Sequence, residues 1–331
     1  MEHKKHFSKL GLLLLLSSVL IFAVQIISLK LFSLIPAVEE STTLSTLATM
    51  LPMYIIAFPI IFWMFGKIPV QVTLEQKKMS AGKIFLAFLI CYAGTYICNF
   101  IGVMLTGIIG MFKQSEVSNV MLDLTQSLHP AANFFIVVIC APIMEELLFR
   151  KALMSRTAQY GEGISILLSG FIFGLFHGNL NQFMYAFLLG IFFGFIYMKT
   201  GNIRYTIILH ICINFMGSFI GAFILDVSNY FDFVAKFTEL SMSGAPSESD
   251  LMALMTEYAG GLVILFAYFL ILIGFVITGL VLFFVNLKKF RVAPGTIVIE
   301  KGKRFSTVIL NAGMILYSIF WIVQIILQLI G

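Results

Sequence analysis

The chain has few charged residues and few cysteines. Only 11% of its 331 residues are Asp, Glu, Lys or Arg, whereas 60% are hydrophobic, and its mean hydropathy is +1.01. Soluble domains carry about 25% charged residues, so this composition excludes an ordinary soluble protein. The four cysteines, Cys91, Cys98, Cys140 and Cys212, form no CxxC pair. We therefore expect buried apolar thiols and neither a disulfide framework nor a cysteine metal site.

Several motifs of other protein classes are also missing. No HExxH helix motif of the zinc proteases occurs in the sequence. No basic cluster alternates with aromatic residues in a soluble segment, which argues against a nucleic-acid partner. The two repeated halves with interrupted helices that many transporters show are absent. Repeats of about 20 to 50 residues, which build solenoids, are absent as well.

Long apolar runs predict an all-α, polytopic protein of the cell membrane. A helix needs about 20 apolar residues to cross the hydrocarbon layer, and about nine runs approach that length in one membrane domain spanning residues 1–331. The N-terminal run is long and ends in no convincing cleavage site, so we expect it to stay as the first helix. The predicted spans are residues 11–36, 46–66, 84–111, 132–155, 163–179, 181–199, 204–226, 260–287 and 306–329.

The distribution of charge predicts the orientation of these spans. Cytoplasmic loops of membrane proteins collect Lys and Arg. With nine spans and a cytoplasmic N-terminus, all of the 21 basic residues except Lys30, Lys113 and Lys236 lie at or near the cytoplasmic side. The segment 226–258 then becomes an acidic extracytoplasmic loop, to which the sequence assigns no chemistry.

Residues 130–220 carry ionisable side chains inside apolar segments, where charge costs several kcal/mol and usually marks function. Glu146 and Arg150 are four residues apart, so we expect them to pair on one helix face. Glu145 points about 100° away from Glu146. Arg150 therefore neutralises Glu146 in this interpretation, and Glu145 is left free to take a proton. A charge cluster that only fixes the topology would leave the two adjacent acids unexplained.

Two further helices supply imidazole and amide groups. Gly170 and Gly174 predict a close helix contact, and Phe173 lies one turn before His177 on the same side. On the next-but-one span, His210 and Asn214 share a face, so that both could donate hydrogen bonds to one oxygen. A base that activates water and donors that stabilise an oxyanion are what hydrolysis of a peptide bond requires.

Helix geometry gives one reason for caution about this grouping. With a rise of 1.5 Å per residue, Glu145, His177 and His210 lie about 16, 21 and 9 Å from the predicted inner helix ends. Helix tilt or different helix ends must bring these depths together if the residues form one site. Glu145, His177 and His210 could alternatively hold zinc, because two His and one Glu are a known catalytic ligand set.

Three motifs in this order resemble the CAAX protease and bacteriocin-processing (CPBP, or Abi) family. EELLFR, from Glu145 to Arg150, matches EExxxR; FGLFH, ending at His177, matches FxxxH; and HICIN, from His210 to Asn214, matches HxxxN. The resemblance covers about residues 130–220. It implies an intramembrane endopeptidase, in which Glu145 and His177 activate water and His210 and Asn214 form the oxyanion hole.

The resemblance also implies supporting roles for Glu146, Arg150 and Phe173. No cofactor is expected unless the enzyme uses zinc. The expected partners are the lipid bilayer and a peptide or protein substrate, such as a prenylated C-terminus or a peptide precursor. A non-catalytic membrane scaffold or immunity protein is the alternative from another class. The sequence leaves the oligomeric state open.

Overall fold

The computed structural model describes residues 2–242, 244 and 246–330, and every regular element in this part of the chain is a helix. Eight helical stretches are long and apolar enough to cross a membrane. This confirms the all-α class and the multi-pass membrane location. The eight stretches are Glu2–Phe32, Thr42–Gly66, Ala81–Lys113, Pro130–Tyr160, Leu180–Thr200, Ile203–Val227, Ala259–Lys289 and Ala312–Ile330.

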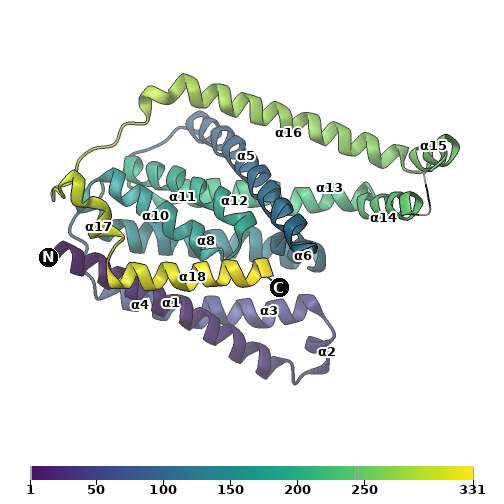
Figure 1. Cartoon of the computed structure of the whole chain (residues 1–331). Helices are drawn as coiled ribbons and strands as arrows, with labels where there is room; N and C mark the ends of the chain where they lie inside the picture. The colour runs from purple at the N-terminus through teal and green to yellow at the C-terminus, as the bar shows by residue number, and fades with distance from the viewer. Residues whose placement is uncertain (1, 243, 245, 331) are drawn as a thin grey trace.

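The helix labels follow Figure 1. Several of the long stretches join α-helical segments to π-helical or 3₁₀ segments, written η. The first three stretches are α1 (Glu2–Phe32), α3–η1–α4 (Thr42–Pro52, Met53–Ala57 and Phe58–Gly66) and α5 (Ala81–Lys113). The fourth is α7 (Pro130–Asn133), η2 (Phe134–Cys140), α8 (Ala141–Glu146), η3 (Leu147–Met154), α9 (Ser155–Thr157) and η4 (Ala158–Tyr160).

The remaining stretches complete the bundle. They are α11 (Leu180–Thr200), α12–η5–α13 (Ile203–Asn214, Phe215–Ile220 and Gly221–Val227), α16–η6 (Ala259–Asn286 and Leu287–Lys289) and α18 (Ala312–Ile330). Shorter elements are α2 (Pro36–Glu39), α6 (Val120–Ser127), α10 (Glu162–Phe176), α14 (Tyr230–Met242), α15 (Glu248–Glu257), η7 (Lys301–Lys303) and α17 (Arg304–Val308).

The predicted number of nine full-length spans is one too many, because α10 is short. This helix has 15 residues, so it is only about 22 Å long, and it corresponds to the predicted span 163–179. It pairs with α11 in a hairpin (Figure 1). The hairpin begins and ends at the same end of the bundle. The basic loops therefore still lie at one end, although the chain has eight full-length spans and not nine.

Glycines make the α10–α11 hairpin unusually close. A Cβ atom added to Gly190 of α11 would lie 2.6 Å from the Cα of Gly170, and one added to Gly174 would lie 3.1 Å from the carbonyl oxygen of Phe183. Backbone contact at this distance is what small residues allow between membrane helices. The helix contact predicted from Gly170 and Gly174 is therefore present.

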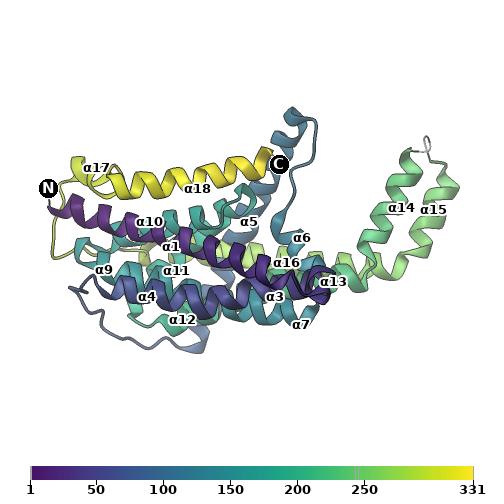
Figure 2. The ribbon, with the colours of Figure 1, turned by 90° about the horizontal axis from the view of Figure 1, so that it is seen from below.

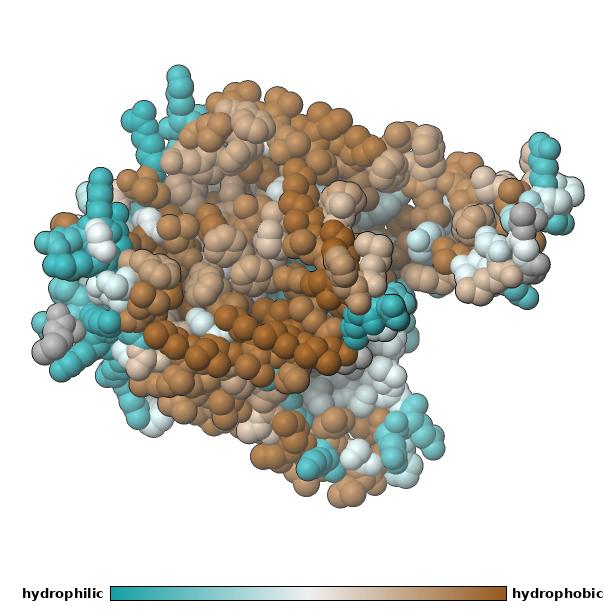
Figure 3. Space-filling view, in the orientation of Figure 1, coloured by the Kyte–Doolittle hydropathy of each residue, from teal (hydrophilic) through white to brown (hydrophobic). Residues whose placement is uncertain are grey.

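The bundle has a basic end and an opposite end. At the basic end, the N–H of Lys77 donates to the carbonyl of Thr200, the N–H of Glu162 donates to the carbonyl of Ala293, and His6 bonds to the carbonyl of Arg156. These bonds join the loops that carry most of the Lys and Arg residues. The N-terminus lies at the same end (Figures 1 and 2). Figure 3 shows a broad hydrophobic surface with hydrophilic residues gathered toward the ends.

At the opposite end, residues 226–258 are largely helical. The helices α14 and α15 form a hairpin that projects away from the bundle (Figure 2). Lys236 donates to Glu257 at 2.6 Å, and Tyr258 donates to Asp232. The Glu257 carboxylate raises the pKa of Lys236 by stabilising its charged form. The segment predicted as an acidic loop is thus a helical hairpin, although residues 243 and 245 lie outside the described residues.

Candidate active site

Glu145 and Glu146 end α8, a six-residue α-helical segment between two π-helical ones. Pro142 lies in the first turn of α8, where its lack of an N–H group removes a helix hydrogen bond. A π-helical segment changes the helical register, and such segments are often found at functional sites. Here they flank the two carboxylates on either side along the same membrane helix.

Glu146 forms a fully buried ion pair with Arg150. The distance from the Nε atom of Arg150 to an Oε atom of Glu146 is 3.1 Å, and both side chains are 0% exposed. Arg150 also lies over the rings of Phe173 and Phe193, at 4.7 and 5.5 Å from their centroids. These rings replace part of the hydration that the guanidinium group loses on burial. The pairing predicted from the four-residue spacing is therefore present.

His210 lies between the two glutamates. Its Nδ1 atom is 3.1 Å from Glu146, and its Nε2 atom is 3.6 Å from Glu145. An ionised carboxylate only accepts hydrogen bonds, so Nδ1 carries a hydrogen when Glu146 is ionised. The Nε2 atom and Glu145 lie within ion-pair distance but beyond hydrogen-bond distance. Glu145 exposes 17% of its side chain, whereas Glu146 exposes none.

His177 follows α10 and has one ring nitrogen free. Its Nδ1 atom lies 2.8 Å from the carbonyl oxygen of Phe173. A carbonyl oxygen only accepts, so Nδ1 is the donor, and Nε2 has a lone pair when the ring is neutral. The Phe173 ring contacts His177 at 4.8 Å and His210 at 5.8 Å between ring centroids. Phe173 thus touches both imidazoles, and the charge of Glu145 also acts on His177.

Asn214 ends α12 one turn after His210. Its Nδ2 group donates to the carbonyl oxygen of Val137 in η2 at 2.9 Å. An amide NH₂ group has two hydrogens, so this bond fixes the side chain and leaves a second donor. The structure therefore holds Asn214 against the helix of the glutamates, one turn after His210.

The depth difference calculated from the sequence is resolved for Glu145 and His210. Their side chains lie 3.6 Å apart, although counting residues from the predicted helix ends separated them by about 7 Å along the membrane normal. The helix of Glu145 continues to Tyr160, beyond the predicted end at residue 155. The extra residues bring the counted depth of Glu145 closer to that of His177 but further from that of His210, so the contact with His210 comes from the packing of α12 against α8 and not from the helix ends.

The residues do not fit a metal centre. Within the described part of the chain, no three His, Cys, Asp or Glu side chains come together in a way that could hold a metal ion. Both ring nitrogens of His210 face carboxylates, and Nδ1 of His177 is bonded to a main-chain carbonyl. The alternative zinc set of Glu145, His177 and His210 therefore finds no support in this geometry.

Comparison with known proteins finds a similarity over the region of the site. A family model described as "Type II CAAX prenyl endopeptidase Rce1-like" matches residues 127–216. This part of the chain is similar to the Rce1-like family. The matched segment contains every candidate residue discussed above, from Glu145 to Asn214.

A curated relative is consistent with this similarity. The chain is 29% identical over 171 residues to the protein described as "Putative membrane peptidase YdiL" from Bacillus subtilis (strain 168). The aligned region covers 49% of this chain and 66% of YdiL. No solved structure matches the chain.

Sequence reasoning missed the polar turn that holds His177. Asn179 is 4% exposed. Its Nδ2 group donates to the carbonyl of His177 at 2.9 Å, and its Oδ1 atom accepts from the N–H of Gln182 at 2.9 Å. Gln182 donates in turn to the hydroxyl of Tyr185, whose ring contacts His177. The signal is the run of Asn and Gln between two apolar segments, whose residues the predicted spans 163–179 and 181–199 place within membrane helices.

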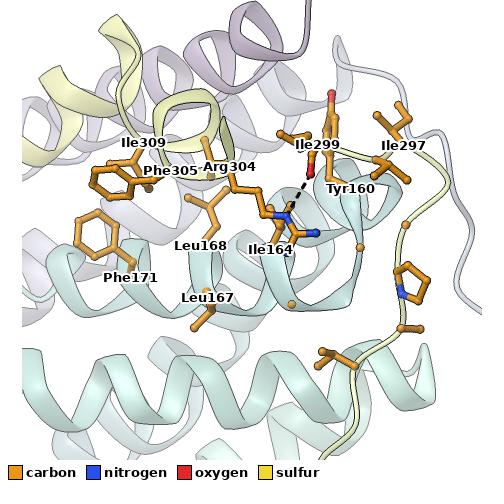
Figure 4. Close-up of a pocket in the computed structure, with 18 of the residues that line it drawn as sticks. Tyr160, Ile164, Leu167, Leu168, Phe171, Ile297, Ile299, Arg304, Phe305 and Ile309 are labelled. Atoms are coloured by element: carbon orange, nitrogen blue, oxygen red, sulfur yellow. Dashed lines mark hydrogen bonds between the residues drawn. The ribbon is translucent and has the colours of Figure 1, made fainter. Parts of the chain in front are cut away.

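A large apolar pocket lies away from these residues. Its volume is about 800 Å³, and it is bounded by α10 and by residues 292–309 (Figure 4). Arg304 donates to the carbonyl of Ile299 at 3.2 Å there. None of the candidate catalytic residues lines this pocket. It therefore plays no part in the chemistry considered below.

Proposed function

We propose that the chain is an intramembrane endopeptidase that hydrolyses a peptide bond with Glu145 as the base. The observation that carries this proposal is the unequal environment of the two adjacent carboxylates. Glu146 is fully buried and already paired with Arg150 and His210, whereas Glu145 is partly exposed and, within the described part of the chain, forms an ion-pair contact with the Nε2 atom of His210 alone. Similarity to a family of CAAX endopeptidases and to a protein described as a membrane peptidase supports the same assignment.

In this proposal Glu145 and His177 activate the water. Glu145 takes a proton from the water as its oxygen bonds to the carbonyl carbon of the substrate. The free Nε2 atom of His177 accepts the other hydrogen of that water and so orients it. When the C–N bond breaks, the proton held by Glu145 passes to the departing amine. Atoms and charge balance, because the base is regenerated at the end of the cycle.

His210 and Asn214 would stabilise the oxyanion that forms in this reaction. Glu146 fixes the His210 ring through Nδ1, as an orienting carboxylate does in other His sites. A protonated His210 can then offer its Nε2 hydrogen, and Asn214 can offer the amide hydrogen that Val137 does not use. Removing one oxyanion donor typically slows an enzyme by about 10²- to 10³-fold.

The expected substrate is a membrane-associated peptide or protein. The family description names CAAX prenyl endopeptidases, so a prenylated C-terminus is one candidate, and a peptide precursor is another. The basic loops favour an orientation with the N-terminus in the cytoplasm. A catalytic group inside the bundle suits a substrate that is held at or in the bilayer.

The test is cleavage of a quenched peptide library by the purified protein in liposomes. We expect wild type to cleave and Glu145→Gln to lose at least 100-fold in rate, because the base is removed while the shape is kept. His177→Ala should lose a similar amount. Glu39→Gln changes an exposed carboxylate outside the site and should cleave normally.

Two results would count against this mechanism. Cleavage that stops with a chelator and returns with zinc would replace it by a metal mechanism. Absence of cleavage in every sample, together with full biological function of both site variants at normal abundance, would indicate a non-catalytic scaffold.

A further inference from the structure

The large apolar pocket beside α10 lies toward the basic end of the bundle. One wall is α10, and the other is the chain from residue 292 to residue 309, which includes α17 (Figure 4). Its volume of about 800 Å³ is within the range of about 300–1,000 Å³ that is usual for ligand sites. Leu168 and Val308 in its wall expose only 2% and 7% of their surface, whereas Phe305 and Val298 expose 65% and 77%. The pocket therefore has a buried floor and opens on the outer surface of the bundle.

Main-chain contacts fix the second wall of this pocket to the start of α10. The N–H of Ile297 donates to the carbonyl of Gln159 at 2.9 Å. The N–H of Ala293 donates to the carboxylate of Glu162 at 2.7 Å. Gly295 allows the two chains to approach, since a Cβ atom added there would lie 2.2 Å from the carbonyl oxygen of Gln159. The wall is therefore held in place by specific contacts, and the pocket is part of the fold.

One cationic group lies in this apolar wall. Within the described part of the chain, Arg304 is the only charged residue that lines the pocket. Its Nε atom donates to the carbonyl of Ile299 at 3.2 Å (Figure 4), and its two Nη groups have no hydrogen-bond or ion-pair partner among the described residues. A guanidinium group presents a planar fork of N–H donors that matches a phosphate group. Arg304 thus has donors available for an anion.

The segment around Arg304 is strongly positive. Between residues 287 and 304 there is a single acid, Glu300, and it pairs with Lys303 at 2.7 Å. Glu162, at the start of α10, pairs with Lys199. Clusters of Lys and Arg at a membrane surface attract anionic lipid head groups. The basic residues of the segment are Lys288, Lys289, Arg291, Lys301, Lys303 and Arg304.

We propose that this pocket binds one anionic phospholipid from the membrane leaflet at the basic end, with an acyl chain between α10 and residues 292–309 and the phosphate at Arg304. The apolar wall accounts for the acyl chain, and the available guanidinium donors account for the phosphate. A soluble phosphate would make no use of the apolar wall. The ammonium group of a zwitterionic lipid would find Glu162 and Glu300 already paired. This site is separate from the proposed catalytic residues and does not depend on their function.

Two glycines distinguish the pocket from the rest of the lipid-facing surface. Gly163 lines the pocket, and a Cβ atom added there would meet only a methyl group of Val292, at 3.6 Å. The ring of Gly163→Phe should therefore occupy the pocket. Gly274 in α16 is exposed and does not line the pocket, and an added Cβ would meet nothing within 4 Å. Gly274→Phe is thus the matched control.

A second pair of variants tests the phosphate contact. Arg304→Gln removes the charge in the wall, whereas Lys301→Gln removes an equal charge from an exposed residue of the same segment that does not line the pocket. Arg304 is itself exposed, so Arg304→Gln should fold and should keep the test decisive even if Gly163→Phe does not fold.

The measurement is native mass spectrometry of the purified protein in detergent micelles, titrated with phosphatidylglycerol or phosphatidylcholine. We expect one phosphatidylglycerol molecule to bind saturably, about tenfold or more tightly than phosphatidylcholine, because its phosphate meets an uncompensated positive segment. Gly163→Phe and Arg304→Gln should each weaken this binding by about tenfold or more, and Gly274→Phe and Lys301→Gln should bind like wild type. Glycerol phosphate, which has no acyl chain, should not compete.

Several results would overturn the proposal. Equal binding of the two lipids without saturation would show ordinary contact with surrounding lipid. Equal binding by Arg304→Gln and Lys301→Gln would remove the phosphate contact, and competition by glycerol phosphate would indicate a site for a free phosphate. Displacement of phosphatidylglycerol by a prenylated peptide at a lower concentration than phosphatidylglycerol itself would assign the pocket to a substrate. None of these readouts uses cleavage, so failure of the lipid site is distinguishable from failure of the proposed function.

Discussion

Arg150 is the residue whose replacement we expect to destabilise the protein most. Arg150→Met retains a long unbranched side chain, which is apolar, and removes the charge that lies 3.1 Å from Glu146. Breaking a buried ion pair by removing one partner costs about 3–5 kcal/mol, because the other charge stays buried. His210 still contacts Glu146 at 3.1 Å, so we place the loss at the lower end, about 3 kcal/mol. That corresponds to more than a hundredfold in the folding equilibrium, at about 1.4 kcal/mol per tenfold.

The double variant Glu146→Gln/Arg150→Met should recover much of this loss of stability, since neither position then carries a charge that would be buried without a partner. Lys151→Met is the matched control, because Lys151 is exposed and should change stability by about 0.5 kcal/mol or less. Denaturant unfolding in micelles, followed by the fluorescence of the buried Trp321, measures all four proteins. The reasoning fails if Arg150→Met unfolds like wild type, or if the double variant is less stable than the single one.

Further variants test the hairpin and its turn. Gly190→Ala should lose about 1–3 kcal/mol from overpacking against Gly170. Gly163→Ala, whose added Cβ would lie in ordinary contact 3.6 Å from a methyl group of Val292, should unfold like wild type. Equal stabilities of the two variants would contradict the close contact. Asn179→Ala and Asn202→Ala each remove a side chain that caps a helix, and each should lose about 1 kcal/mol. Only Asn179→Ala should also slow cleavage, because Asn179 holds the carbonyl of His177; equal cleavage rates would show that the turn does not position that residue.

Local spacing predicted the parts of the site that lie on one helix. Glu146 and Arg150 pair as four-residue spacing requires, and Gly170 approaches α11 as a small residue allows. The membrane class followed from hydropathy alone, because a run of about 20 apolar residues is typical of a membrane-spanning helix. These predictions depend on periodicity within a segment, which the sequence contains directly.

Contacts between segments could not be obtained in this way. That His210 lies between Glu145 and Glu146 depends on how α12 packs against α8, and residue counts from uncertain helix ends gave inconsistent depths. The π-helical segments add to the error, since they change the helical register on both sides of the glutamates. The length of α10 was overestimated because the apolar pattern continued into the turn that contains His177. The contacts of Asn179 and Tyr185 with His177 depend on the position of that turn, which the sequence does not give.

The shortness of α10 has a consequence for how the protein is made. Its 15 residues are fewer than the roughly 17 to 25 of a membrane helix, so α10 is poorly suited to insert into a bilayer alone. The turn after it contains polar groups that lipid cannot satisfy. In the folded chain α18 covers this region: Trp321 packs against Phe176, and the hydroxyl of Tyr317 donates to the carbonyl of Ile172. Because α18 emerges from the ribosome more than 100 residues after α10, the α10–α11 hairpin can pack against α18 only after that part of the chain has been synthesised. A chain that ends before α18 should therefore reach the membrane with its catalytic region still unassembled.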